Sequence, residues 1–271
     1  MSVPSVALAG HAGRIPQLGL GTWRLDGEEC ERTVALALDL GYRHIDTAEG
    51  YGNEREVGCG IAGAGRSSLW ITTKVWRQYL APSDLRRRCE KSLRRLGTDY
   101  LDLYLVHWPN RDIPIERTVA GFEALREDGL IRAWGVSNFT PTHVREACAH
   151  GTPATNQVEL HPYFNQRPLV EVQRELSIPV TAYSPVARGA VLDDPVLVEI
   201  ARAHDRTPAQ VALRWAVQHG HIVIPKAASE LHLRDNLEVF GFELTPDEMR
   251  RIDDLPQGER LVDGEWSEFD R

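Results

Sequence analysis

The sequence has few cysteines, no long apolar run and no excess of positive charge, and each shortage excludes a class of protein. Its four cysteines among 271 residues, Cys30, Cys59, Cys89 and Cys148, form no Cys-x-x-Cys pair, so free thiols are expected rather than a disulfide framework. No apolar run approaches the ~20 residues that span a bilayer. The formal net charge of −8 argues against nucleic acid, because phosphate binding needs a basic surface. We therefore expect neither a membrane nor a nucleic acid as partner.

Further absences bear on location, organisation and metal binding. Met1–Gly10 has no Lys or Arg before its apolar residues and so lacks the start of a signal peptide, which indicates a cytoplasmic protein. No linker-like or low-complexity stretch interrupts the chain, so we expect one domain over residues 1–271. The histidines show no metal-ligand spacing, and no metal site is expected. His143 and His150 are interpreted as solvated helix residues, and His44 as packing among helices.

Eight short apolar runs are present, and they alternate with helix-like segments. The runs lie at residues 18–22, 43–47, 69–75, 101–107, 131–138, 154–159, 178–184 and 222–226. Strands that alternate with helices imply βαβ units and a parallel sheet. Eight such units close more naturally into a (β/α)8 TIM barrel than into an open sheet, and the chain length suits one barrel of roughly 250 residues. Gly19–Trp23 lacks the third glycine of a dinucleotide-binding fingerprint, which lowers the case for a Rossmann domain.

Elements outside the eight units are also expected. Weak alternation over Val6–Gln17, with a turn at Gly10–Gly13, predicts an N-terminal hairpin outside the barrel. Thr207–Gln210 and Thr245–Glu248 are capping-box patterns with proline at the first helical position, so each predicts a helix start. Asp194–His204 is interpreted as an extra helix. The C-terminal part therefore contains more helices than eight units require.

Each apolar run ends in a polar residue of a kind that takes part in chemistry. The residues at these ends are Thr22, Asp46, Lys74, His107, Ser137 with Asn138, Gln157, Tyr183 and Lys226. One polar strand end alone is more often a solvated rim residue or an ion pair. Eight of them in register predict that the C-terminal rim of the barrel forms one site.

Four residues of this predicted rim can form a proton donor. Tyr51 follows the second run, and a tyrosine with its ordinary pKa of about 10 is a poor acid. The ammonium of Lys74 would lower that pKa, and Asp46 would keep the ammonium charged. His107 could hydrogen-bond a carbonyl oxygen from the other side. Taken singly, each residue fits a rim, surface or core position, but together they indicate a proton donor beside a carbonyl.

At these residues the sequence resembles the aldo-keto reductase family, and it looks most like the bacterial diketogluconate-reductase branch. Gly41–Ala48 with Tyr51–Glu54 is similar to the first family signature. Three more are matched by Leu101–Pro109, Gly135–Phe139 and Ile224–Lys226. The resemblance extends from about Gly19 to Leu255. It implies a monomeric barrel that transfers hydride from NADPH to a small carbonyl compound, an aldehyde or a ketone.

The resemblance also implies a role for each rim residue. Tyr51 is the general acid, Lys74 and Asp46 tune it, and His107 orients the carbonyl. The residues implied for the nicotinamide end of the cofactor are Ser137, Asn138 and Gln157 at the carboxamide, Tyr183 on the ring, and Thr22, Trp23, Asp46 and Ser184 along the channel. Those implied for the substrate are Trp23, Tyr51, Trp76, His107 and Trp108.

Two features of the substrate side stay open. Trp76 and Trp108 could instead be packing residues of the rim. The C-terminal tail, Leu261–Arg271, and the loop Pro109–Pro114 are short, which predicts an open pocket and broad substrate acceptance. Trp266 could cover the lip of this pocket or lie in a disordered end.

The 2′-phosphate site departs from the family pattern. Ala227 stands where the family usually has serine, and His232 where it has arginine, whereas Lys226 remains. Asp235 and Asn236 match the residues that hold the adenine end. Histidine is a weaker cation than arginine and has no bidentate fork. We therefore expect NADPH with a reduced preference and measurable use of NADH, with Arg234 as a possible substitute contact.

Two other functions compete with the reductase. A barrel that binds cofactor but regulates a partner, with little turnover, need not retain all of Asp46, Tyr51, Lys74 and His107. A Schiff-base lyase would use Lys74 as a neutral amine. Asp46 would keep this amine charged, which argues against the lyase.

Overall fold

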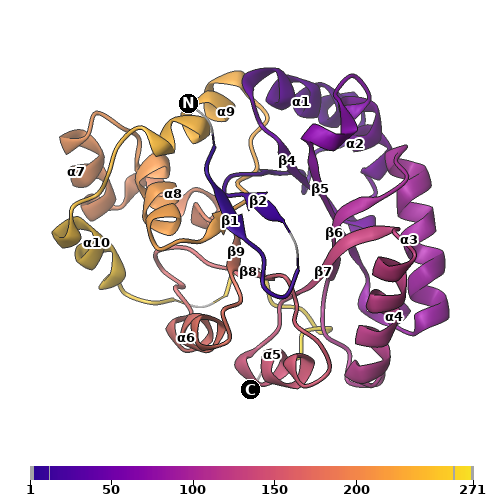
Figure 1. The fold of residues 1–271 in the computed structure, drawn as a ribbon. Helices are drawn as coiled ribbons and strands as arrows, with labels where there is room; N and C mark the ends of the chain where they lie inside the picture. The colour runs from indigo at the N-terminus through magenta and orange to yellow at the C-terminus, as the bar shows by residue number, and fades with distance from the viewer. Residues whose placement is uncertain (1–2, 12, 259, 270–271) are drawn as a thin grey trace.

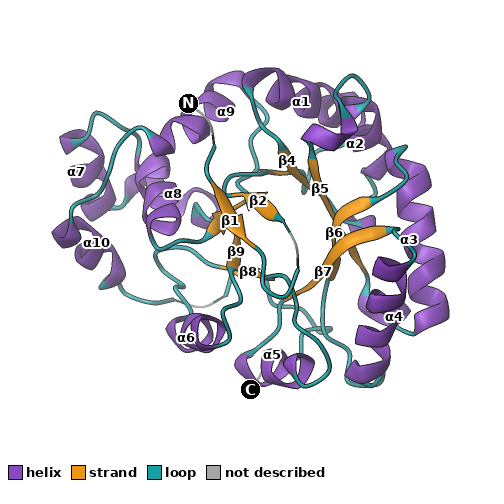
Figure 2. Ribbon diagram, in the orientation of Figure 1, coloured by secondary structure: helices purple, strands orange, loops and turns teal. Residues whose placement is uncertain are grey.

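The computed structural model describes residues 3–11, 13–258 and 260–269, and it confirms an α/β barrel with strands inside and helices outside (Figures 1 and 2). Eight parallel strands follow one another around the sheet in chain order. They are β3 (Leu20–Gly21), β4 (His44–Asp46), β5 (Trp70–Val75), β6 (Leu101–Val106), β7 (Ile131–Ser137), β8 (Asn156–Glu159), β9 (Val180–Tyr183) and β10 (Ile222–Val223). Each lies within one of the eight apolar runs, as expected of buried parallel strands.

Backbone contacts between the first and last strands close the sheet. Leu18 forms a parallel bridge with Val223, and the Gly19 N–H donates to the Val223 carbonyl at 2.9 Å. The Gly21 N–H donates to the Pro225 carbonyl at 3.1 Å. A Cβ on Gly21 would lie only 2.6 Å from the carbonyl oxygen of Ile224, so this close approach requires glycine. The closed sheet brings all strand ends to one rim.

Ten α-helices lie outside the strands in the described residues. They are α1 (Gly27–Leu40), α2 (Glu54–Ile61), α3 (Pro82–Leu96), α4 (Ile115–Glu127), α5 (Pro141–Cys148), α6 (Arg167–Glu175), α7 (Pro195–Ala203), α8 (Pro208–Gln218), α9 (Glu230–Leu237) and α10 (Pro246–Asp253). The capping boxes predicted at Thr207 and Thr245 are confirmed, because both side chains accept the N3 backbone N–H. The extra helix is α7. No helix of the described part of the chain is both long and apolar enough to cross a membrane.

The predicted N-terminal hairpin consists of β1 (Ser5–Ala7) and β2 (Arg14–Pro16), which pair antiparallel. It lies across the centre of the ring of strands (Figure 1). Leu8 and Ile15 pack there in a buried apolar cluster with Trp70, Leu103, Leu105, Ala133, Ala154 and Ile222. The hairpin therefore closes one end of the barrel, and the site lies at the other.

Two interpretations of histidines were wrong. His44 is fully buried inside the barrel, where Nε2 lies 3.2 Å from the hydroxyl of Thr72, because alternate strand residues share a face and Asp46 points inward. His143 is also buried, and its ring lies 3.0 Å from the Thr140 hydroxyl in a capping box of α5. His150 is exposed, in the turn after that helix.

Two buried histidines predict a loss of stability in acid. Burial lowers the pKa of His44 to about 4 and, together with the charge of His219, that of His221 to about 3. The unfolded chain therefore binds protons below pH ~6.5 that the folded chain rejects, so stability falls with pH from there toward ~4. The two residues together should lower the free energy of unfolding by about 4 kcal/mol between pH 7 and pH 5.

Urea denaturation at both pH values measures this effect. In His221→Gln, the drop between pH 7 and pH 5 should shrink by about 2 kcal/mol. His150→Gln, on the exposed turn, is the matched control and should keep the full drop. A drop of equal size in His221→Gln and in the unmodified protein would contradict the assignment.

Candidate active site

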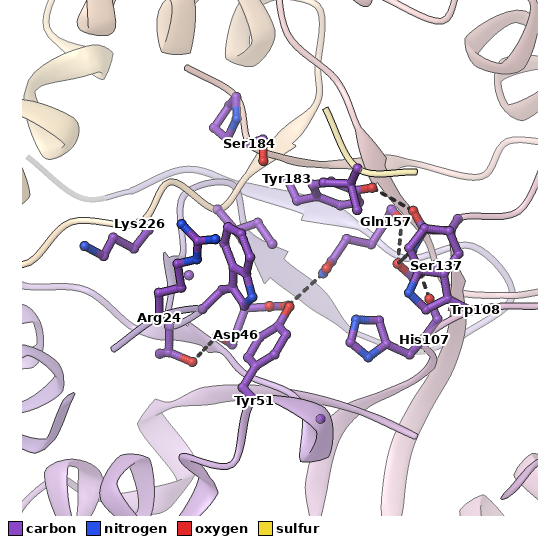
Figure 3. A pocket seen from close by; sticks show the side chains of 18 of the residues that line it. Arg24, Asp46, Tyr51, His107, Trp108, Ser137, Gln157, Tyr183, Ser184 and Lys226 are labelled. Carbon is purple, nitrogen blue, oxygen red and sulfur yellow. Dashed lines mark hydrogen bonds between the residues drawn. The ribbon is translucent and has the colours of Figure 1, made fainter. Parts of the chain in front are cut away.

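A cavity of about 620 Å³ opens at the carboxyl ends of the strands (Figure 3). Most of the residues expected at the site line it. They are Thr22, Trp23, Asp46, Tyr51, Trp76, His107, Trp108, Ser137, Asn138, Gln157, Tyr183, Ser184 and Lys226. Their sequence separation spans most of the chain, so the barrel rim is what brings them together.

Lys74 lies beneath the cavity floor and joins Asp46 to Tyr51. Its Nζ donates to Asp46 Oδ1 at 2.5 Å, to the Thr47 carbonyl at 2.9 Å and to the Tyr51 hydroxyl at 3.3 Å. Asp46 ends β4 and Lys74 lies in the neighbouring strand β5, and both of these side chains point into the barrel. The side chain of Lys74 is fully buried, so its three donors are all used and its position is fixed.

Burial adds a second influence on the proton of Tyr51. It raises the pKa of Tyr51 above its ordinary value and outweighs the lowering by Lys74. The lowering expected from Lys74 is therefore present, but the extent of burial could not be inferred from a loop position. Burial alone would lower the pKa of Lys74, but Asp46 and Tyr51 raise it above its ordinary value. A charged Lys74 is the opposite of what a Schiff-base lyase requires.

His107 faces the same space as Tyr51 (Figure 3). The two rings meet edge to face with centroids 5.7 Å apart, and the ring of Trp76 also meets that of His107 edge to face at 5.2 Å. Burial and the nearby charge of Lys74 lower the pKa of His107 well below its ordinary value. The imidazole is therefore neutral at physiological pH and can donate or accept a hydrogen bond beside the Tyr51 hydroxyl.

Amide side chains extend the network across the barrel. Gln157 Nε2 donates to Asp46 Oδ2 at 2.7 Å, so the second carboxylate oxygen of Asp46 is also occupied. The Ser137 hydroxyl donates to the Gln157 carbonyl at 2.7 Å. The first bond connects β8 to the Asp46–Lys74 pair and fixes the Gln157 amide relative to the Asp46 carboxylate. The second, to the backbone carbonyl of Gln157, joins β7 to β8.

Asn138 occupies the next position along the rim. Its Nδ2 donates to the His107 carbonyl at 2.9 Å, and its Oδ1 accepts the Tyr183 hydroxyl at 2.8 Å. The backbone of Asn138 has φ of 62°, a left-handed conformation that asparagine tolerates better than most residues. The turn after β7 thus directs an amide into the cavity.

Three cations line the cavity, and two of them, Lys226 and Arg24, lie at the end that is remote from His107 and Trp108 (Figure 3). Lys226 was expected from the sequence, whereas Arg24 and Arg188 were not. Their guanidinium carbons lie 4.3 and 5.4 Å from the ring centroid of Trp23. Arg24 lies in a turn and Arg188 at a kink in the short helix η4 (Ala187–Asp193), both with positive φ, 62° and 52°, and neither forms an ion pair with a described residue. Position next to Trp23 and near Ser184 is the one sequence signal that could have suggested them.

The remaining residues expected for the cofactor do not line the cavity. Ala227 is buried, His232 is exposed in the first turn of α9, and Asp235 and Asn236 follow on the same helix. They lie beyond Lys226, on the segment from β10 to α9. Arg234, the possible substitute, pairs with Glu230 at 2.7 Å on the exposed face. The assignment of these residues to the adenine end stays a prediction.

The C-terminal segment contributes to the cavity more than its length suggested. Val262 and Trp266 line it. The Trp266 ring lies 6.0 Å from that of Trp76 and 6.2 Å from that of Trp108. The three tryptophans form a wall of the cavity, which we call the tryptophan wall.

Other chemistries find no site in the described residues. No group of three or more His, Cys, Asp or Glu side chains is placed to hold a metal ion there. All four cysteines are free thiols, and burial raises the pKa of Cys30 and Cys89 to about 12.

Comparison with known proteins gives a consistent result. The sequence model of the Aldo/keto reductase family matches residues 17–257. A glyoxal reductase of Bacillus subtilis is 43% identical over 257 residues, which cover 93% of each chain. The structure of a putative 2,5-diketo-D-gluconic acid reductase B superposes with a TM-score of 0.93 at 40% identity over 98% of both chains. A Bombyx mori aldo-keto reductase in complex with NADP gives 0.91 at 34% identity, covering 97% of this chain and 96% of that one.

Proposed function

The chain belongs to the aldo/keto reductase family and is an NAD(P)H-dependent oxidoreductase, and on this premise we propose that it reduces small aldehydes and ketones to alcohols with NADPH. The observation that carries the proposal is the Tyr51 hydroxyl, held 3.3 Å from the buried ammonium of Lys74 and beside a neutral His107. A hydroxyl in this setting can give a proton to a carbonyl oxygen. The measurement is NADPH consumption with aldehydes, diketones and keto-sugars.

The side chains that line the cavity fit nicotinamide adenine dinucleotide phosphate. The amides of Asn138 and Gln157 and the Tyr183 ring lie at one end, where a carboxamide and an aromatic ring would bind. Lys226 and Arg24 lie at the other (Figure 3), in a protein whose net charge is −8, and cations suit phosphate groups. When bound, the cofactor supplies the hydride that the carbonyl carbon receives.

The side chains perform the remaining steps. Tyr51 donates its phenolic proton to the carbonyl oxygen, and the ammonium of Lys74 stabilises the phenolate that is left. Asp46 holds that ammonium charged and in place. His107 hydrogen-bonds the same oxygen and orients the carbonyl. The carbon gains hydride, the oxygen gains the proton, the alcohol leaves, and Tyr51 recovers a proton from solvent.

The substrate end favours small, mainly apolar carbonyl compounds. Trp23 and the tryptophan wall surround it, and aromatic walls with few polar groups suit such ligands. The similarity to a glyoxal reductase and to a putative diketogluconate reductase supports diketones and keto-sugars as further candidates.

The cofactor preference should be moderate and adjustable at position 232. His232 lacks the guanidinium fork that binds a phosphate with two hydrogen bonds, so we expect an NADPH preference below roughly a thousandfold, with measurable NADH use. His232→Arg should tighten NADPH binding about tenfold and leave NADH binding unchanged. Fluorescence titration gives both dissociation constants, and kcat/KM gives the preference in turnover.

The matched control for position 232 adds the same charge at a neighbouring exposed position. Leu231→Arg places a guanidinium on the preceding residue of α9, where the side chain is 65% exposed. A similar gain in both variants would show that net charge alone acts. No gain in His232→Arg would remove this residue from the cofactor site.

We also propose a cytoplasmic monomer with one domain over residues 1–271. The four free thiols suit a reducing compartment, and one chain supplies every side chain of the proposed mechanism. Sedimentation velocity tests the oligomeric state, and an active dimer would overturn the monomer.

A further inference from the structure

We propose that Glu159 is a specificity-determining positioning residue, which fixes the C-terminal segment 261–268 and thereby the place of Trp266 at the substrate end of the cavity. The inference builds on the proposed reductase function. Glu159 touches neither substrate nor cofactor in this proposal. It acts through the backbone of the segment.

The carboxylate of Glu159 lies at the end of β8 and is fully buried. Oε1 accepts the backbone N–H of Leu261 at 2.8 Å, and Oε2 accepts that of Val262 at 2.9 Å. His161 Nε2 lies 3.1 Å from Oε1. No Lys or Arg of the described residues lies within ion-pair distance, although a buried carboxylate needs compensation. Two backbone N–H groups of the C-terminal segment therefore provide much of that compensation.

The other end of the segment is held by an ion pair. Glu268 pairs with Arg77, which follows β5 in the short helix η3 (Arg77–Tyr79), and its second oxygen lies 3.6 Å from Arg111 Nε. The two attachments lie at the carboxyl ends of different strands, Glu159 at the end of β8 and Arg77 just after β5. The segment thus crosses the substrate end as a strap, and the term strap is used below for residues 261–268.

Trp266 lies between the two attachments. Its ring belongs to the tryptophan wall, yet 42% of the residue is exposed. Packing alone therefore holds it weakly, and the attachments decide how far it reaches into the cavity. Release of the Glu159 end should let Trp266 move outward, which widens the cavity for large substrates and removes a contact from small aromatic ones.

The test compares substrates of two sizes. Glu159→Gln presents an amide NH2 to one of the two backbone N–H groups, so one of the hydrogen bonds is lost. With NADPH saturating, we expect the ratio of kcat/KM for benzaldehyde to that for 2-naphthaldehyde to fall about tenfold, chiefly through KM. Glyoxal, too small to reach the strap, should change less than about twofold, as should the dissociation constant of NADPH.

Two further variants complete the set. Glu268→Gln weakens the other attachment at a partly exposed side chain and should shift the ratio in the same direction. Glu199→Gln is the matched control, because this exposed carboxylate pairs with Arg251 on the helices α7 and α10. It should leave the ratio unchanged. A ratio that moves equally in Glu199→Gln would overturn the proposal.

Hydrogen exchange measures how firmly Glu159 holds the strap, and it does not depend on turnover. In Glu159→Gln the amides of Leu261 and Val262 should exchange about tenfold faster or more, while the strands keep their protection. If this variant does not fold, Val262→Pro removes one donor from the strap side and leaves the barrel intact. Unchanged exchange or an unchanged substrate ratio in a folded variant would refute the role of Glu159. No turnover in the unmodified protein would instead refute the proposed function.

Discussion

Replacing Tyr51 with phenylalanine should lower kcat for carbonyl reduction about a thousandfold, while the dissociation constant of NADPH stays within about twofold. The substitution removes one oxygen, the atom that lies 3.3 Å from Lys74 Nζ. The ring that packs edge to face against His107 is retained. A loss confined to kcat would therefore show that the proton donor is missing and not that the cavity has changed shape.

Tyr104→Phe is the matched control for this substitution. Tyr104 is fully buried against Phe122, and its hydroxyl has no hydrogen-bond partner among the described residues. Its removal should leave turnover and cofactor binding as they are. Equal turnover in Tyr51→Phe and the unmodified protein would overturn the acid role. Tight cofactor binding with no turnover in either would favour a barrel that binds cofactor and regulates a partner.

The barrel and its rim could be predicted because burial leaves a direct mark on the sequence. Parallel strands covered on both faces read as continuous apolar runs, and the run at 101–107 matches β6 at Leu101–Val106. Strand ends were less certain, since 222–226 reduces to Ile222–Val223 in β10. Because the carboxyl ends of parallel strands meet at one rim of a barrel, Asp46, Lys74 and His107 could be placed together without any knowledge of side-chain contacts.

The features that could not be predicted depend on backbone conformation or on distant contacts. Arg24 and Arg188 reach the cavity from backbone positions with positive φ, a conformation that their residue type does not indicate. Glu159 binds an N–H that lies 102 residues away, at Leu261. The direction in which the pKa of Tyr51 shifts depends on how deeply its loop is buried, and burial follows from packing alone.

Replacing Lys74 with methionine should affect both activity and stability. Because Asp46 is then left buried without its cation, the free energy of unfolding should fall by about 3–5 kcal/mol. Because the phenolate of Tyr51 loses its stabilising charge, kcat should fall by about two to three orders of magnitude. Urea denaturation and NADPH consumption measure the two effects separately. Arg250→Met, which breaks the exposed pair with Asp247, is the control and should change both little.

The double variant Lys74→Met/Asp46→Asn separates the two roles of Lys74. Asparagine keeps the shape of Asp46 and can still accept the bond from Gln157, but it carries no charge that needs a partner. We therefore expect the double variant to regain about half of the lost stability and none of the lost activity, a non-additive result for two residues in contact. If activity returned together with stability, Lys74 would act by holding the fold, and the proton donor would not need its charge. If stability returned without activity, the charge of Lys74 would be required for the reaction itself.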